Sequence, residues 1–289
     1  VAEVPYDEIT KIAETPSVSH VILDRRVQIC LNESVPIIKP NWEYVEQKLG
    51  TEVNGSGVIV AVLDTGIDLG HPDLKDAVIE SVTFVEGEDI YDHNGHGTHV
   101  AGIIAGSGSA SNGKFMGVAP GAKILNVKVA NQYGIAWLSD IVDGITWAVN
   151  HSAKVISISL GSTPDFELWS PFEDSPFYEA VRWAVSQGVL VVIAAGNDGN
   201  KGHYYINTLA HIDEAFTVGA LDKDLTPAYY SSIGPVLDLR LKPDIAAIGS
   251  NVISTRAWGI DFGTPIEVPL GQWYTMASGT SMATPFVSG

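Results

Sequence analysis

Short apolar runs alternate with helical patterns along most of this 289-residue chain. The runs have the length of strands and are almost continuous in valine, isoleucine, leucine and alanine, which is typical of strands covered on both faces. Such runs, alternating with helices, predict an α/β fold with a mainly parallel central sheet and helices on both faces. The predicted strands span residues 58–64, 78–85, 122–130, 155–160, 189–194 and 215–220.

Two of the segments between these runs have the periodicity of amphipathic helices. Residues 137–151 place apolar side chains three and four positions apart, which predicts a helix with one buried face. Residues 177–187 repeat the pattern and stop at Gly188, a residue type that is common just beyond a helix end. In a fold of this kind, reactive groups gather at the carboxyl ends of the strands and at the helix starts that follow them.

Composition excludes some classes of protein. The chain has 16 Lys and Arg against 34 Asp and Glu, a formal net charge of −18, so it should repel nucleic-acid phosphates and we expect no nucleic-acid partner. No run reaches the ~18 apolar residues of a membrane-spanning helix, so we expect no membrane span. Cys30 is the single cysteine, which excludes an intrachain disulfide.

Four polar residues lie where the predicted fold would place a site. Asp64 ends an apolar strand, His96 opens a glycine-flanked helix start, Asn197 follows a strand, and Ser281 lies at another small-residue helix start. Aspartate, histidine and serine can together transfer an acyl group, because a neutral imidazole can accept the proton of an attacking hydroxyl near neutral pH. Taken singly, the carboxylate and the hydroxyl could equally be helix caps, and the asparagine a turn residue.

The segments around these residues resemble the subtilisin-like serine proteases (subtilases). The matching sequences are Asp-Thr-Gly at Asp64, His-Gly-Thr-His at His96 and Gly-Thr-Ser-Met-Ala-Thr-Pro at Ser281, in the chain order of subtilisin. The resemblance implies a broad-specificity serine endopeptidase that forms an acyl-enzyme. In it, Ser281 is the nucleophile, His96 the base, Asp64 the group that orients the base, and Asn197 a donor to the oxyanion. His99 is then structural.

The resemblance also implies a set of substrate contacts. Two segments would form the walls of the pocket for the residue before the scissile bond, a third would pair with the substrate backbone, and one asparagine would lie at the pocket base. These residues are Ser159, Leu160 and Gly161 for one wall, Ala194, Ala195 and Gly196 for the other, Gly134, Ile135 and Ala136 for the pairing edge, and Asn207 for the base.

Other functions remain open at this point. Asp92, His93, His96 and His99 could bind a metal ion, although Gly97 stands where the zinc-protease pattern requires Glu. A nucleotide-binding α/β protein would explain the glycines, but neither phosphate-binding glycine motif follows a strand. A subtilase that serves only as a binding module would keep this fold without a working triad.

The resemblance divides the chain into two parts. Residues 1–34 resemble the C-terminal part of the inhibitory propeptide of subtilases, with an ordinary N-terminal hairpin as the alternative. Residues 35–289 resemble the catalytic domain, which we expect to be incomplete at its C-terminus. The implied partners are protein or peptide substrates and the chain's own propeptide, and the implied location is extracellular.

The resemblance implies no cofactor for catalysis. Residues 106–114 lack the calcium-binding loop of bacterial subtilisins and look more similar to archaeal or pyrolysin-type subtilases. Asp73 matches one calcium ligand of the family, but one carboxylate does not make a site. The sequence is thus compatible with a structural calcium ion and assigns no ligands to it.

Overall fold

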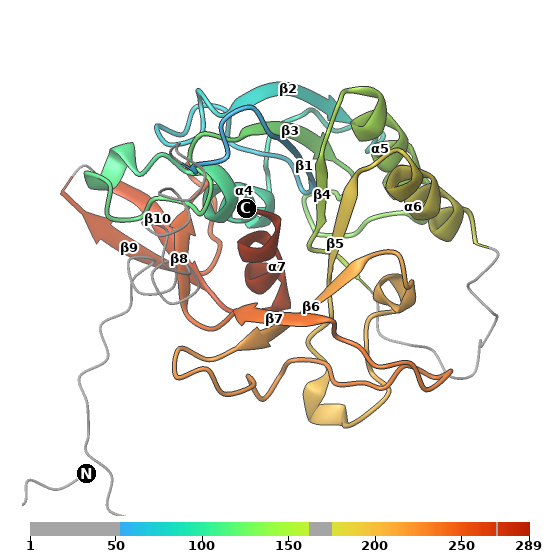
Figure 1. Cartoon of the computed structure of the whole chain (residues 1–289). Helices are drawn as coiled ribbons and strands as arrows, with labels where there is room; N and C mark the ends of the chain where they lie inside the picture. Colours follow the sequence, from blue (N-terminus) through green and yellow to red (C-terminus); the bar gives the residue numbers. More distant parts are fainter. Residues whose placement is uncertain (1–52, 162–174, 270) are drawn as a thin grey trace, which may run out of the picture.

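The computed structural model describes residues 53–161, 175–269 and 271–289. A seven-stranded parallel sheet forms its centre, with the strand order β2-β3-β1-β4-β5-β6-β7 (Figure 1). The strands are β1 (Ile59–Asp64), β2 (Val78–Thr83), β3 (Lys123–Lys128), β4 (Val155–Ile158), β5 (Leu190–Ala194), β6 (Phe216–Leu221) and β7 (Ile245–Ile248). The first six coincide with the predicted runs to within a few residues, so the expected α/β fold is confirmed.

Helices cover both faces of this sheet (Figure 1). Helices α4 (His96–Ala105) and α7 (Thr280–Ser288) pack on one face, and α5 (Leu138–Asn150) and α6 (Pro176–Ser186) pack on the other. Strand β1 shows the reason. Val60 and Val62 belong to the core with α4 and α7, whereas Ala61 and Leu63 belong to the core with α5 and α6, because successive side chains of a strand point to opposite faces.

Helix α6 shows how local sequence sets its ends. The Ser175 side chain accepts a hydrogen bond from Tyr178 N, and Pro176 occupies the first turn, where its missing N–H is not needed. Gly188 follows the helix with a φ of 79°, a left-handed conformation that glycine adopts without steric cost. The sequence therefore places both ends of this helix.

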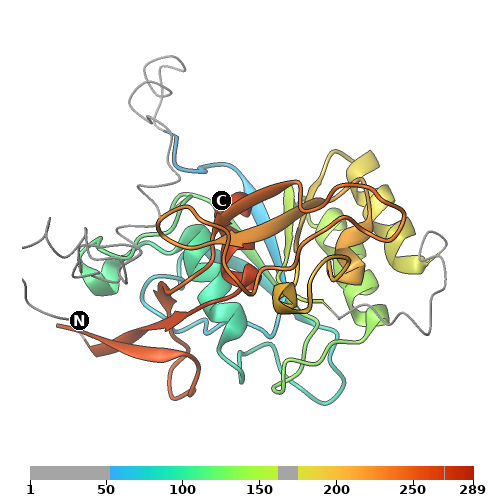
Figure 2. The same ribbon diagram turned by 90° about the horizontal axis from the view of Figure 1, so that it is seen from below.

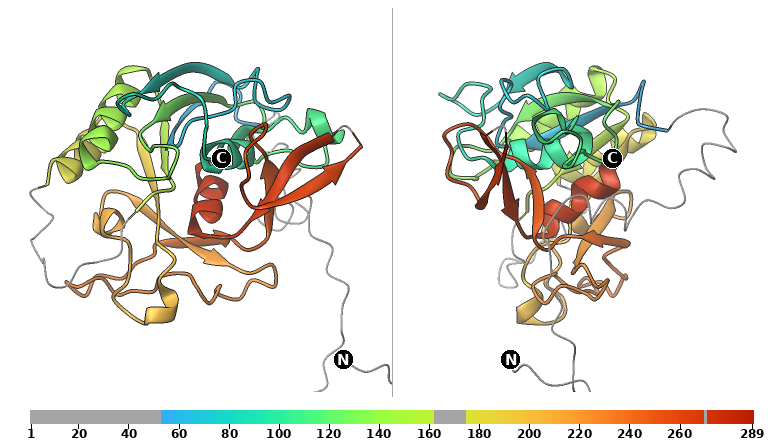
Figure 3. Two further views of the ribbon diagram at one scale, coloured as in Figure 1. Left: turned by 180° about the vertical axis from the view of Figure 1, so that it is seen from behind. Right: turned by 90° about the vertical axis from the view of Figure 1, so that its left-hand side faces the viewer.

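A second, antiparallel sheet lies beside α4, with the strand order β8-β10-β9 (Figures 2 and 3). It comprises β8 (Val252–Thr255), β9 (Thr264–Val268) and β10 (Gly271–Ala277). Two hydroxyls of β8 donate to the helix backbone, Ser254 Oγ to His99 O at 2.8 Å and Thr255 Oγ1 to Thr98 O at 2.6 Å. The sequence analysis did not predict this sheet.

The strand order alone, without any sequence motif, identifies the edge of the parallel sheet at which a ligand site is expected. The neighbours of β1 are β3 on one side and β4 on the other, so the chain reverses its direction of travel across the sheet at β1. Ligands of open α/β sheets bind at the carboxyl ends of strands beside such a point. Within the described residues, no helix is long and apolar enough to cross a membrane.

Candidate active site

Asp64 is the last residue of β1 and lies at the carboxyl edge of the sheet. Its side chain is buried, with Oδ1 accepting hydrogen bonds from Thr65 N at 2.8 Å and from His96 Nδ1 at 2.7 Å. The two side chains come together because the turn after β1 passes directly beside the start of α4. A Cβ on Gly97 would lie 2.2 Å from Gly66 O, so only glycine permits this approach.

The start of α4 is held by a buried carboxylate, Asp92. Its Oδ1 accepts from Gly95 N at 2.8 Å and from Thr65 Oγ1 at 2.9 Å, and its Oδ2 accepts from Thr98 N at 2.9 Å. A carboxylate near a helix N-terminus also interacts favourably with the unpaired N–H groups there. Asp92 thereby fixes the helix that carries His96 to the turn that follows Asp64.

The environment of His96 favours its protonated form. Burial by itself lowers the pKa of His96, but the charge of Asp64, the hydrogen bond to Asp64 and the charge of Asp92 outweigh it and raise the pKa above 6.5. Because Nδ1 is bonded to Asp64, Nε2 is the ring nitrogen left to exchange a proton with a substrate or a neighbouring hydroxyl. Asp64 and His96 can therefore act as an oriented general base.

A buried lysine donates hydrogen bonds to the turn that follows Asp64. Lys128, at the end of β3, is fully buried and donates to Thr65 O at 2.6 Å and to Tyr91 O at 3.1 Å. Its Nζ also lies 3.1 Å from Glu88 Oε2, which compensates the buried charge. Lys128 therefore connects the turn after Asp64 to the loop that leads into Asp92. The sequence analysis missed it, since one lysine within an apolar run gives no signal of its partners.

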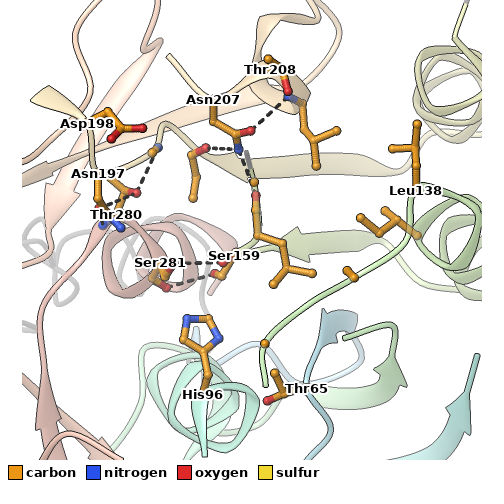
Figure 4. Close-up of a pocket in the computed structure, with 18 of the residues that line it drawn as sticks. Thr65, His96, Leu138, Ser159, Asn197, Asp198, Asn207, Thr208, Thr280 and Ser281 are labelled. Carbon is orange, nitrogen blue, oxygen red and sulfur yellow. Dashed lines mark hydrogen bonds between the residues drawn. The ribbon is translucent and has the colours of Figure 1, made fainter. Parts of the chain in front are cut away.

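Ser281 lies in the first turn of α7, on the opposite wall of the cavity from His96 (Figure 4). Its Oγ donates to Ser159 O at 2.9 Å, and Ser159 Oγ donates back to Ser281 O at 3.0 Å. These reciprocal bonds join α7 to the end of β4 across 122 residues of sequence. In the structure described, the hydroxyl of Ser281 thus points to a carbonyl group, and the imidazole faces the same cavity.

Asn197 follows β5 and is anchored by its amide oxygen. Oδ1 accepts from Thr280 N at 2.9 Å and from Thr280 Oγ1 at 3.1 Å. Anchoring through the oxygen leaves Nδ2 as the donor end of the amide, beside Ser281 on the cavity wall (Figure 4). The arrangement can present an N–H group to a developing oxyanion.

The cavity in front of these residues has a volume of about 620 Å³. Most of the predicted substrate residues line it, but Ile135 and Ala195 do not. Ala195 is packed in the core on the α5 and α6 face, and Ile135 projects into solvent. The lining residues that the sequence analysis had named for substrate binding are Gly134, Ala136, Ser159, Leu160, Gly161, Ala194, Gly196 and Asn207.

Asn207 lies between the two walls of this cavity. Its Nδ2 donates to Leu160 O at 2.9 Å and to Ala194 O at 3.0 Å, and its Oδ1 accepts from Leu209 N at 3.1 Å. Gly161 makes room for it, since a Cβ there would lie 2.0 Å from Nδ2. The amide therefore joins the walls and does not offer these donors to a ligand. Leu138, Ile141, Thr208 and Leu209 also line the cavity and were missed.

His99 has a different environment from His96, one turn earlier. It is fully buried, and its Nε2 lies 3.2 Å from both Val252 O and Thr275 O of the antiparallel sheet. Burial and the neighbouring His96 lower its pKa to about 3. The ring is therefore neutral and joins α4 to the second sheet.

These contacts argue against a metal centre at the histidines. Both Asp92 oxygens are occupied by protein donors, and His93 points away to Asp89 at 2.9 Å. His99 faces strand carbonyls. Among the described residues, no three His, Cys, Asp or Glu side chains are grouped to hold a metal ion.

The surroundings of Asp73 do not fit a calcium ion. This buried carboxylate accepts from Ala110 N at 2.9 Å through Oδ1 and from the Tyr274 hydroxyl at 2.7 Å through Oδ2. The same hydroxyl lies 3.0 Å from Ser111 Oγ. Calcium requires six to eight oxygen ligands, whereas this carboxylate is surrounded by protein donors that tie β10 to residues 110–111.

Comparison with known proteins identifies the family to which this chain is similar. The model of the subtilase family, Peptidase S8, matches residues 55–289. Serine protease AprX of Bacillus subtilis is 37% identical over 96% of this chain, and the alignment spans 65% of AprX. A thermostable alkaline protease of Halalkalibacterium halodurans is 34% identical over 100% of this chain and 70% of its own length.

A solved structure is also similar. That of a cold adapted subtilisin-like serine proteinase is 30% identical and superposes with a TM-score of 0.64, covering 82% of this chain and 74% of that one. The similarity to an archaeal or pyrolysin-type subgroup stays a prediction. The family model, the curated relatives and the solved fold agree, and this chain therefore belongs to the subtilase family of serine proteases.

Proposed function

We propose that this chain hydrolyses peptide bonds as a serine endopeptidase, with Asp64, His96 and Ser281 as its triad and Asn197 as an oxyanion donor. The observation that carries the proposal is the 2.7 Å hydrogen bond between His96 Nδ1 and Asp64, with Ser281 on the facing wall of the same cavity. This arrangement supplies an oriented base and a hydroxyl nucleophile.

In the first step, Ser281 Oγ attacks the carbonyl carbon of the scissile bond and gives its proton to His96 Nε2. Asp64 stabilises the resulting imidazolium. The carbonyl oxygen becomes an oxyanion that Asn197 Nδ2 and the backbone N–H of Ser281, at the start of α7, can stabilise. The intermediate collapses as His96 returns the proton to the leaving nitrogen, which departs as an amine and leaves an ester on Ser281.

In the second step, a water molecule attacks the ester while His96 takes one of its protons. The carbon–oxygen bond to Ser281 breaks, the proton returns to Oγ, and the carboxylic acid product leaves.

Before the first step, the hydrogen bond from Ser281 Oγ to Ser159 O must be exchanged for one to His96 Nε2. Such a bond commonly forms only when substrate binds.

We propose a broad specificity for extended peptides with an apolar or mid-sized side chain before the scissile bond. The two wall segments of the cavity, residues 159–161 and 194–196, contain only small and apolar residues, and Asn207 uses its amide hydrogens within the protein. Asp198 also lines this cavity, but its carboxylate pairs with Lys201 at 2.8 Å. A peptide strand would pair with the edge at Gly134–Ala136, as in strand addition generally.

For the N-terminal part we propose an intramolecular inhibitor in residues 1–34, cut between about Leu31 and Val35 by the chain's own triad. These residues lie outside the described structure, and the proposal rests on their sequence alone. Cleavage there should require Ser281. We also propose an extracellular location, on the resemblance to subtilases, and no cofactor in the chemical step.

Labelling with a fluorophosphonate tests the catalytic proposal. The reagent should form an adduct on Ser281, which tryptic peptide mass spectrometry would locate, and the wild-type chain should cleave an extended chromogenic peptide. The Ser281→Ala protein should do neither while keeping the circular dichroism spectrum of the wild type. Labelling of a different residue, or undiminished cleavage by purified Ser281→Ala protein, would overturn the assignment.

A further inference from the structure

The edge proposed to pair with a substrate belongs to a loop that follows β3, residues 131–136, which we call the pairing loop. Inside this loop, Asn131 Oδ1 accepts hydrogen bonds from Tyr133 N and Ile135 N, both at 3.0 Å. These bonds fix the shape of the loop, but residues 132–135 are exposed to solvent. The distance from the loop to the proposed reacting residues must therefore be set by contacts with other segments.

Two hydrogen bonds from a second loop hold the backbone of Gln132. Its N–H donates to Glu88 Oε1 at 3.1 Å, and its carbonyl oxygen accepts from Asn94 Nδ2 at 3.1 Å. Glu88 and Asn94 both lie between β2 and α4. A bond from a backbone N–H to a carboxylate is stronger than one between neutral groups, so Glu88 is the stronger of the two anchors.

The other oxygen of Glu88 lies next to the buried ammonium group of Lys128. Oε2 is 3.1 Å from Lys128 Nζ, and Nζ donates to Thr65 O, the carbonyl directly after Asp64, at 2.6 Å. The Lys128 side chain is 0% exposed and that of Glu88 17%. Water screens a pair of this kind much less than a surface pair. One carboxylate therefore contacts both the pairing loop and the lysine that holds the turn after Asp64.

The segment between these two contacts is short and tied to Asp64. Lys128 is the register partner of Asp64 in the paired strands β3 and β1. The next two residues continue the connection, since Val129 N and Ala130 N donate to Asp64 O at 2.9 and 3.1 Å. The pairing loop begins with the residue after that. The carboxylate of Glu88 thus closes a small ring between the end of β3 and the pairing loop.

We propose that Glu88, paired with Lys128, is a positioning residue that fixes the pairing loop relative to Asp64 and His96. Glu88 does not line the cavity, so it acts through the loop and not on a substrate. The inference rests on the proposed function, because it concerns how an extended peptide is held for attack by Ser281. It goes further by making substrate alignment depend on a carboxylate that takes no part in the proposed proton transfers.

Two substrates of different length separate this role from a general structural one. The acetylated tetrapeptide Ala-Ala-Ala-Leu can pair along the loop, whereas acetyl-leucine ends before it. Both are prepared as thiobenzyl esters, so the acylating residue and the leaving group are the same. The measured quantity is the long-to-short ratio of kcat/KM, with active sites titrated by a fluorophosphonate so that inactive protein does not contribute.

Glu88→Ala should lower the long-to-short ratio on the order of tenfold, as expected for the loss of a hydrogen bond to a charged group. Glu88→Gln keeps the size of the side chain and serves if the alanine variant does not fold. Its amide has one oxygen for two donors, the Gln132 N–H and the Lys128 ammonium. We expect it to lower the ratio by about threefold.

Glu214→Gln is the charge-matched control. Glu214 also forms an ion pair, with Arg182 at 3.1 Å, but both side chains are well exposed and neither lines the cavity. This variant makes the same +1 change in net charge as Glu88→Gln. It should leave the long-to-short ratio at the wild-type value, because it does not alter the pairing loop.

The outcomes distinguish this inference from the proposed function. If neither ester nor the fluorophosphonate acylates the wild type, the proposed function fails. If the wild type reacts and prefers the long ester, but the folded Glu88 variants keep the wild-type ratio, the positioning role is wrong although the function stands. Equal losses on both esters per active site would show that Glu88 only supports the fold, and would also overturn the inference.

Discussion

The seven-stranded parallel sheet and the three-stranded antiparallel sheet both contact α4, but they give different things to the site. The parallel sheet places Asp64 at the end of β1 and Asn197 after β5, and its strands β1, β3, β4 and β5 are almost wholly buried. The antiparallel sheet is half exposed, and β9 is its outer strand. It contributes the carbonyls that hold His99 and, from its loop, the ring of Phe262 against His96.

The difference separates the sheet that carries groups of the proposed proton transfers from the smaller sheet that packs against them. Groups that transfer protons need fixed positions, and a sheet covered on both faces provides them, because its core has few alternative packings. A smaller, half-exposed sheet can change its side chains at lower cost to the core. The predictions below ask whether that division holds, beginning with the largest expected effect.

Removal of the nucleophile should have the largest effect. Ser281→Ala should lower the rate of peptide hydrolysis on the order of 10⁶-fold, the scale seen when a subtilisin loses its serine, while thermal unfolding stays near that of the wild type. The assay compares kcat for a chromogenic peptide with the unfolding midpoint. A loss smaller than about tenfold would show that the chemistry does not depend on α7.

The two histidines of α4 test the division directly. His96→Ala should remove activity almost completely and leave the fold intact, since only its ring reaches the cavity. His99→Ala should instead cost about 2–4 kcal/mol of unfolding free energy, because a buried side chain between α4 and the antiparallel sheet is lost. The paired measurements are kcat/KM and urea unfolding. The opposite pattern would exchange the roles of the two residues.

Removal of the proposed oxyanion donor should have the next largest effect on activity. Asn197→Ala should lower kcat by about 10²–10³-fold with little change in KM, because the donor acts only on charge that develops in the transition state. Thr280→Val serves as the comparison, since it removes the hydroxyl and its bonds to Asn197 Oδ1 and Gly196 N but keeps the shorter contact from Thr280 N to Asn197 Oδ1. Equal losses in the two variants would mean that anchoring, and not donation, explains the effect.

Two variants, each of which removes one buried polar side chain, compare how much such contacts stabilise the parallel and the antiparallel sheet. Lys128→Met should cost about 3 kcal/mol or more, because it removes the ion-pair partner of Glu88 and leaves two carbonyls without the lysine donor. Tyr274→Phe removes one donor from the Asp73 carboxylate and should cost about 1–3 kcal/mol. Both are measured by urea unfolding. A larger loss for Tyr274→Phe would place the more critical contact in the antiparallel sheet.

The pH dependence is the smallest effect. Burial lowers the pKa of His96, and Asp64 and Asp92 raise it by more, so the net shift is upward from 6.5. The base must be neutral to accept the Ser281 proton, so kcat/KM should rise with pH through a midpoint above 6.5. A weaker hydrogen bond in Asp64→Asn should shift this midpoint downward in whatever activity remains. A wild-type midpoint below 6.5 would contradict the assigned environment.

The effect of a calcium chelator on stability can be predicted from the contacts of Asp73. Because the Asp73 carboxylate is occupied by Ala110 and Tyr274, a chelator should not change the stability that these contacts provide. Within the part of the chain that the structure describes, no three His, Cys, Asp or Glu side chains are grouped to hold a metal ion, and the compatibility with a structural calcium ion inferred from the sequence stays a prediction.

Much of the architecture could be predicted because it is encoded locally. The runs that became β1, β3, β4, β5 and β6 are mostly apolar on both faces, and α5 and α6 carry a helical stripe, so their neighbours in sequence already specify them. Strands β7 to β10 were not predicted: β7 and β8 are only four residues long, and β9 and β10 lack the apolar signal. The β9 strand is five residues long, contains Pro265 and is mostly exposed, and a short half-exposed strand is stabilised by its partners more than by its own pattern.

The candidate site divides in the same way. The sequence by itself determined which residues could do the chemistry, since a carboxylate, an imidazole, an amide and a hydroxyl each lie in a short motif. Only the tertiary structure decided their partners: Asp64 meets His96 across 32 residues, Ser281 meets Ser159 across 122, and Asn207 closes a gap that Gly161 leaves open. A motif fixes the backbone around one side chain. Cavity walls and hydrogen-bond partners depend instead on how distant segments pack, which no local pattern records.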